Sequence, residues 1–172
     1  MAPASNSTDA SFYDQFKSIA NTVEAAQVSE FLLGEYCFDD QLFTPGEKHL
    51  MLVMPLRSIL EHDVICWYAE EAGKVVAAII FVENELRCGG FRLEYFGVHR
   101  AYRHRGYGTY MLKRMFQYCN EQNGRYIETY TSDLPEYAKS RQLFEYFGFQ
   151  FMCHLPHYYF PGEGKMVYYK LL

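Results

Sequence analysis

The sequence lacks a hydrophobic run of the roughly 18 residues needed to cross a bilayer, and its opening MAPASNSTDAS has neither the basic start nor the apolar stretch of a signal peptide. We therefore expect a cytoplasmic protein without a membrane partner. Basic charge is also scarce, because 16 Lys and Arg against 21 Asp and Glu give a formal net charge of −5 at pH 7. Nucleic acids and anionic membranes usually bind basic surfaces, so this balance argues against both as the main partner.

Closely spaced cysteines are absent as well. The five cysteines are far apart and form no CxxC pair, which argues against a disulfide framework and against a thiolate zinc site. His154 and His157 could offer two metal ligands, but the proline between them and the lack of a nearby acidic or thiol partner favour a surface turn. We predict no metal.

The chain has enough residues for one domain. Its 172 residues, 49% of them hydrophobic, can bury the core of one domain but are too few for two ordinary ones. We predict a disordered tail at residues 1–11 and a single domain at residues 12–172. The aromatic fraction of 18% is high, which is typical of a packed sheet or an aromatic-lined cleft.

Turn signals and hydrophobic periodicity divide the chain into strands and helices. Strands are predicted at 16–20, 63–71, 74–85, 91–100, 125–132, 149–160 and 165–172. Helices are predicted from Asn21, which has capping-box spacing to Glu24, to about Tyr36, and at 45–60, 106–123 and 135–147. Hairpins join antiparallel strands and crossover helices join parallel ones, so this order predicts an α/β fold with a mixed sheet.

A basic, glycine-broken turn separates the strand that ends near Val98 from the helix that starts near Gly106. Unpaired backbone N–H groups and the positive end of a helix dipole meet at such a turn, and both attract phosphate. Gly106 and Gly108 let the backbone approach a bulky anion, while Arg103 and Arg105 can add charge-assisted hydrogen bonds. The glycine pair alone also fits a solvated helix cap. Neither the P-loop pattern nor the dinucleotide-binding pattern is present.

The residues of this turn resemble a known family. Val98-x-x-x-x-Arg103-x-x-Gly106-x-Gly108 matches the signature V-x-x-x-x-[RQ]-x-x-G-x-[GA] of the GNAT superfamily of acetyl-CoA-dependent N-acetyltransferases. The segment 140–149, SRQLFEYFGF, is similar to the A-x-x-L-Y-E-x-x-G-F helix of the same family. The resemblance implies a mixed, mostly antiparallel central sheet, splayed between its fourth and fifth strands and flanked by four helices.

The resemblance also implies a site for acetyl-CoA as co-substrate. The pantetheine arm is expected along the strand at 96–98 and the pyrophosphate in the turn. The implied cofactor-binding residues are Phe96, Val98, Arg103, His104, Arg105, Gly106, Tyr107, Gly108, Thr109 and Phe144.

Acetyl transfer to an amine requires a deprotonated amine and a proton for the departing thiolate. Glu94 is the predicted base, because strand alternation places it on one face with Phe96 and Val98. The alternative interpretations of Glu94 are an ion pair with Arg92 and an exposed strand carboxylate. The family commonly has a tyrosine as the acid where this chain has Phe144, so either water assists the departing thiolate or another donor reaches it. Ser140, four residues earlier on the same helical face, is the predicted catalytic candidate through contact with coenzyme A.

The acceptor is expected between the loop after the first helix and the last hairpin. Asp39 and Asp40 could attract a cationic amine, and Tyr158 and Tyr159 could pack on it. We predict a small-molecule acceptor such as an amine, amino acid or polyamine. The alternatives are a protein lysine or N-terminus, or a non-catalytic acyl-CoA binding module. A homodimer paired through the last hairpin is also expected by analogy.

Overall fold

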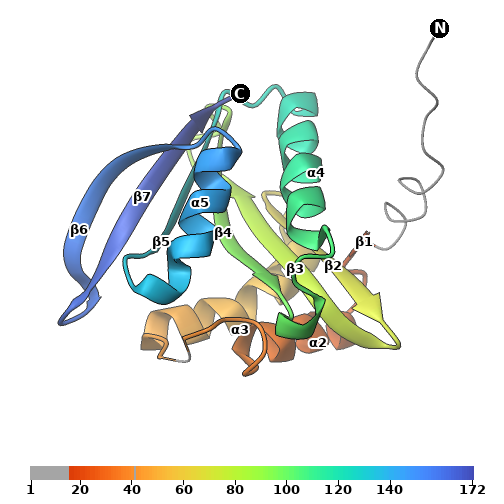
Figure 1. Cartoon of the computed structure of the whole chain (residues 1–172). Coiled ribbons are helices and arrows are strands. Elements are labelled where there is room, and N and C mark those ends of the chain that lie inside the picture. Colours follow the sequence, from red (N-terminus) through yellow and green to blue (C-terminus); the bar gives the residue numbers. More distant parts are fainter. Residues whose placement is uncertain (1–15, 41) are drawn as a thin grey trace, which may run out of the picture.

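The computed structural model describes residues 16–40 and 42–172, so the predicted tail at 1–11 and the start of the predicted domain lie outside the described residues. Within these ranges seven strands form one sheet in the order β1-β2-β3-β4-β5-β7-β6 (Figure 1). The strands are β1 (Phe16–Ser18), β2 (Val64–Glu71), β3 (Lys74–Glu83), β4 (Gly90–Val98), β5 (Tyr126–Ser132), β6 (Gln150–Phe160) and β7 (Glu163–Leu171). Each of the seven predicted strands is found, with boundaries that shift by a few residues.

Helices cover both faces of the sheet. They are α2 (Thr22–Leu33), α3 (Pro45–Leu60), α4 (Tyr107–Glu121) and α5 (Ala138–Tyr146), with two short 3-10 helices, η1 (Arg100–Tyr102) and η2 (Pro135–Tyr137). Val28 and Met54 of α2 and α3 belong to one buried cluster, while Met111 and Phe144 of α4 and α5 belong to the other. The fold class that the family resemblance implies is confirmed.

Local signals account for where the first two helices begin. The Asn21 side chain caps α2 by accepting the N–H groups of Val23 and Glu24, both at 3.0 Å. The Glu24 side chain accepts the N–H of Ala20 at 2.8 Å. A capping box would have it accept the N–H of the next residue, Asn21. The helix ends at Leu33, three residues before the predicted end. Helix α3 has a complete capping box at its own start.

The sheet opens between its fourth and fifth strands. Strand β4 pairs with β5 in parallel only from Gly90–Tyr126 to Leu93–Thr129. Past that point β5 continues to pair with β7 as far as Ser132, and β4 continues to pair with β3 as far as Val98. Beyond Leu93, β4 therefore has no strand partner among the described residues on the side that faces β5, and an extended ligand can pair with the backbone of such an edge.

A β-bulge lies in β4 at the start of this opening. In the ladder with β3, Ile80 pairs with Tyr95, whereas the next residue, Phe81, pairs with Leu93. Glu94 is the extra residue, and a bulge of this kind changes the direction of side chains and bends the strand. The irregularity falls where the two central strands diverge.

Strand β6 forms one edge of the sheet, and most of its residues are exposed. Phe151, Met152 and Tyr158 are large apolar side chains exposed on it. The homodimer stays a prediction. It would pair two copies of the chain through the β6 edge. His154 and His157 lie in this strand rather than in the predicted surface turn.

Across the two described ranges, no helix is both long and apolar enough to span a membrane.

Candidate active site

The basic turn connects the open end of β4 to α4. Its backbone adopts the left-handed region at His104 (φ 63°) and at Gly106 (φ 91°). Gly106 is the N-cap residue of α4 and provides no side-chain hydrogen bond to the first helical turn. Backbone N–H groups in such a turn can converge on an anion at the helix N-terminus, as the sequence predicted.

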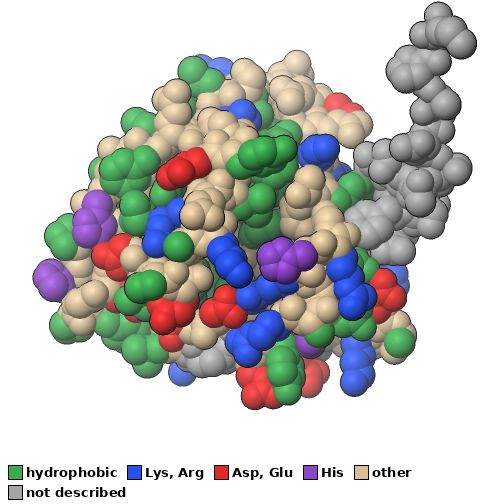
Figure 2. Space-filling model, viewed as in Figure 1, with side chains coloured by type: hydrophobic (Ala, Val, Ile, Leu, Met, Phe, Trp, Pro, Cys, Tyr) green, Lys and Arg blue, Asp and Glu red, His purple; other side chains and the backbone are tan. Residues whose placement is uncertain are grey.

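A cavity of about 290 Å³, here called the phosphate-side cavity, lies beside this turn. Figure 2 shows a recess between α5 and α4 with an apolar floor and cationic side chains at its lower rim. Eight predicted cofactor residues line the cavity, namely Phe96, Val98, Arg103, His104, Gly106, Tyr107, Gly108 and Thr109. Two others do not, because Arg105 lies over the Tyr102 ring at 4.7 Å and Phe144 lines the neighbouring cavity.

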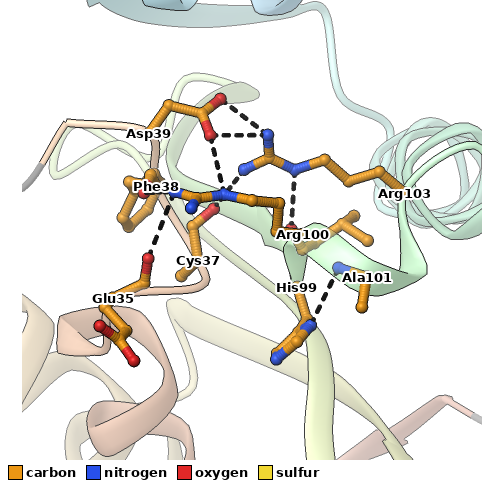
Figure 3. Close-up of polar contacts among 9 residues, drawn as sticks. Glu35, Cys37, Phe38, Asp39, His99, Arg100, Ala101 and Arg103 are labelled. Carbon is orange, nitrogen blue, oxygen red and sulfur yellow. Dashed lines mark hydrogen bonds and ion pairs between the residues drawn. The ribbon is translucent and has the colours of Figure 1, made fainter.

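Arg103 has protein partners on several sides of its guanidinium. It donates to both carboxylate oxygens of Asp39 at 2.9 and 2.7 Å, to the Cys37 carbonyl at 2.9 Å and to the Val98 carbonyl at 3.2 Å (Figure 3). Asp39 also pairs with Arg100 at 3.4 Å. The arginine therefore ties the segment between α2 and α3 to the end of β4.

These contacts correct the prediction for Asp39. The carboxylate was expected to attract the amine, but it lies in the phosphate-side cavity, neutralised between two arginines. Arg103 was expected to bind pyrophosphate with its side chain. The four hydrogen bonds above instead make that side chain a structural link between the segment after α2 and the end of β4. The sequence did not indicate this pairing, because Asp39 and Arg103 are 64 residues apart.

Arg103→Ala should lower the free energy of unfolding by about 1–3 kcal/mol, because Asp39 and two carbonyl groups lose a charged donor. Arg105→Ala removes an exposed guanidinium from the same turn and its contact with the Tyr102 ring, and it should change stability by at most about 0.5–1 kcal/mol. Urea unfolding of the two variants measures this difference. Equal stabilities would show that the Arg103 contacts contribute nothing.

A smaller cavity of about 100 Å³, here called the central cavity, lies at the opening between β4 and β5. Four carboxylic residues line it, namely Asp40, Glu47, Glu94 and Glu163, and no Lys, Arg or His is among its described lining residues. Burial raises the pKa of Glu163, and Asp40 and Glu47 raise it further. Predicted residues Asp40 and Tyr159 are both in this lining.

Glu94 is held in a defined position at the bulge. Its carboxylate accepts hydrogen bonds from Arg92 Nε and from the Tyr130 hydroxyl, both at 2.5 Å, and its side chain is only 6% exposed. The alternation argument that placed it on one face with Phe96 and Val98 is wrong. Those two side chains pack against the cluster under α4, whereas Glu94, the bulged residue, turns to Tyr130.

A third cavity of about 500 Å³, here called the outer cavity, lies beyond Glu94 and is lined by residues of α3, β4 and β5. The predicted acceptor residue Tyr158 lines this cavity rather than the central one. The Lys165 ammonium lies 4.6 Å from the Tyr158 ring centre and 3.7 Å from the Tyr130 ring centre. Tyr158 therefore already contacts a cation of the protein itself.

The cavities meet at a few shared residues. Phe38, Phe96, Tyr137 and Ser140 line both the phosphate-side and the central cavity, and Glu94, Thr129 and Tyr130 line both the central and the outer cavity. The predicted residue Ser140 therefore lies at the boundary between the phosphate-side and the central cavity.

Two residues of the central cavity, Tyr137 and Glu163, were not predicted from the sequence. Tyr137 could have been found, because it precedes Ser140 and Phe144 by three and seven residues, which is the spacing of one helical face.

Comparison with known proteins agrees with this geometry. The sequence profile of the Acetyltransferase (GNAT) family matches residues 30–149. A sequence comparison with curated proteins found no match. A GNAT-family structure from Desulfovibrio desulfuricans has a TM-score of 0.77 at 20% identity, over 91% of this chain and 97% of that chain. An aminoglycoside 6'-N-acetyltransferase complexed with coenzyme A has a TM-score of 0.70 at 15% identity, over 91% and 96%. The ribosomal-protein-S18-alanine N-acetyltransferase from Escherichia coli has a TM-score of 0.69 at 15% identity, over 91% and 92%.

The structural likenesses concern the fold, an α/β sheet that opens between two parallel central strands. These likenesses define the fold class, whereas the activity rests on the family profile. The family profile covers well over half of the chain. The chain belongs to the GNAT family of acetyltransferases and is an acyl-CoA-dependent acetyltransferase.

Proposed function

We propose that the protein transfers the acetyl group of acetyl-CoA directly to a primary amine of a small cationic molecule. The observation that carries this proposal is the succession of three adjoining cavities through the opening between β4 and β5. A donor can enter from the turn side and an acceptor from the other side. The two reactants would then meet at the central cavity.

On the donor side, the turn at residues 103–109 supports binding of a diphosphate. Two left-handed residues and an N-cap without a side-chain partner leave the backbone to provide the hydrogen bonds. The end of β4, which has no strand partner among the described residues on the side that faces β5, can pair with the amide groups of a pantetheine arm. Coenzyme A is therefore the proposed co-substrate, and the proposed chemistry needs no metal.

On the acceptor side, the central cavity favours a cation. Burial raises the pKa of Glu163, repulsion from Asp40 and Glu47 raises it further, and an ammonium group would relieve that repulsion. Glu94, between the central and outer cavities, is the proposed group that takes the proton from the amine. At about 100 Å³ the central cavity has room for the amine end of an acceptor, and the outer cavity has room for the rest.

Two measurements test this function together. Coenzyme A at a hundred times its Kd should add about 2.7 kcal/mol of stability, which corresponds to a rise of about 5–10 °C in Tm for a domain of this size. Thiol release from acetyl-CoA should then occur with small cationic amines and not with anionic ones. Release with peptides alone would favour a protein acceptor, and a Tm rise without release on any amine would favour a binding module. No Tm rise and no thiol release would contradict the proposal.

A further inference from the structure

Cleavage of a thioester leaves a thiolate that needs a proton, and Phe144 cannot supply it. The Phe144 side chain is 4% exposed and packs against the rings of Phe149 and Tyr168 at centroid distances of 5.6 and 5.9 Å. It lines the central cavity with carbon atoms only. If the chain has a proton donor for this step, the donor must come from another position.

The inference rests on the proposed function, which puts the thioester where the donor and acceptor cavities meet. Only four described residues line both the phosphate-side and the central cavity, and two of them are phenylalanines. The other two, Tyr137 and Ser140, carry hydroxyl groups. The candidates for contact with the sulfur atom are therefore reduced to these two side chains.

Tyr137 is well held by its backbone and has an available hydroxyl group. It is the last residue of η2 and the N-cap residue of α5, and its N–H donates to the Leu134 carbonyl at 3.1 Å. Among the residues that the structure describes, its hydroxyl has no hydrogen-bond partner. Because Tyr137, Ser140 and Phe144 are spaced by three and four residues, their side chains lie on one face of the α5 helix.

The chemistry of the two hydroxyl groups favours the tyrosine. A phenol is a far better acid than an aliphatic alcohol, and tyrosine is among the side chains that enzymes use as general acids, whereas serine usually acts as a nucleophile. Burial raises the pKa of Tyr137, and the carboxylates of Asp40, Glu163 and Glu47 raise it further. The tyrosine therefore carries its proton at neutral pH, so its hydroxyl is in the donor form when the thioester is cleaved.

We propose that Tyr137 is the catalytic residue that protonates the departing thiolate of coenzyme A. The amine nitrogen forms a bond to the acetyl carbon, and the bond from that carbon to sulfur breaks. The sulfur leaves with the electron pair and takes the proton of the Tyr137 hydroxyl. The nitrogen loses one proton to Glu94 or to water, and the tyrosinate regains a proton from solvent. The products are the N-acetylated amine and coenzyme A with a free thiol.

Tyr137→Phe should lower kcat for thiol release about 100-fold, while KM for the amine and the Tm rise with coenzyme A stay near their wild-type values. Phenylalanine keeps the ring and removes only the hydroxyl. The decisive variant is the double change Tyr137→Phe with Phe144→Tyr, which puts a hydroxyl back into the central cavity from the same helix face and should recover at least about tenfold in kcat. Tyr146→Phe is the matched control, because Tyr146 is on α5 and 81% exposed, and it should behave as wild type.

The outcomes separate this inference from the proposed function. A wild-type protein that releases no thiol with any amine refutes the function before Tyr137 is tested. A wild-type protein that turns over, together with an equally active Tyr137→Phe variant, refutes the proton donor alone. Loss of the Tm rise with coenzyme A in Tyr137→Phe, or no recovery in the double variant, would assign the tyrosine a packing role and overturn the inference.

Discussion

Glu94→Gln is expected to lower kcat/KM for the amine about 100-fold, which is the usual contribution of a general base. Glutamine keeps the size of the side chain and can still accept the Tyr130 hydrogen bond, but it cannot take a proton from an ammonium group. The central cavity also loses one of the charges that attract a cation. The measurement is thiol release at saturating acetyl-CoA over a range of amine concentrations and of pH.

Glu85→Gln is the matched control for this prediction. Glu85 is exposed and lines the outer cavity, so the same loss of charge occurs without contact with the central cavity. This variant should keep kcat and change KM by a small factor. Equal kcat/KM values in Glu94→Gln and in wild type would remove Glu94 from the mechanism. They would leave water as the proton acceptor.

Gly108→Leu is expected to abolish coenzyme A binding and so to remove the entire Tm rise of about 5–10 °C. A Cβ atom at Gly108 would lie 3.1 Å from the Phe96 ring and 3.9 Å from Leu143. All three residues line the phosphate-side cavity, so a larger side chain would occupy the space predicted for the donor. Thermal unfolding with and without coenzyme A measures the effect.

The fold should survive this substitution. Leucine is favoured over glycine inside a helix by up to about 1 kcal/mol, which offsets part of the cost of shifting Phe96. Gln117→Leu, at an exposed position of the same helix, is the control and should keep the full Tm rise. A Gly108→Leu variant that binds coenzyme A as tightly as wild type would contradict the assignment of this cavity to the donor.

The sequence alone was sufficient to predict features that depend on nearby residues. The hairpin between β2 and β3 was predicted from Ala72 and Gly73, which both adopt positive φ in the turn. The start of α2 followed from Asn21, whose cap needs only the next three residues. The glycine-broken turn after Val98 was recognised in the same way. Its geometry is determined by backbone freedom within a few residues, so its residue pattern is readable directly.

Features that depend on residues far apart in the chain were decided only by the tertiary structure. The bulge that turns Glu94 away from the face of Phe96 arises from register with β3, and sequence alternation contains no information about it. The pairing of Asp39 with Arg103 joins segments 64 residues apart. Both residues therefore have a structural contact in place of the ligand-binding role that the sequence predicted for them.

The cavities also belong to the tertiary structure, since α3, β4, β5, α5 and β7 each contribute to their walls. Glu163 enters the central cavity only because β7 pairs with β5. Local rules therefore determined the helices, the strands and the glycine-broken turn. Packing between distant elements determined which side chains share a cavity, because side-chain direction and burial are set by neighbours that the sequence does not place.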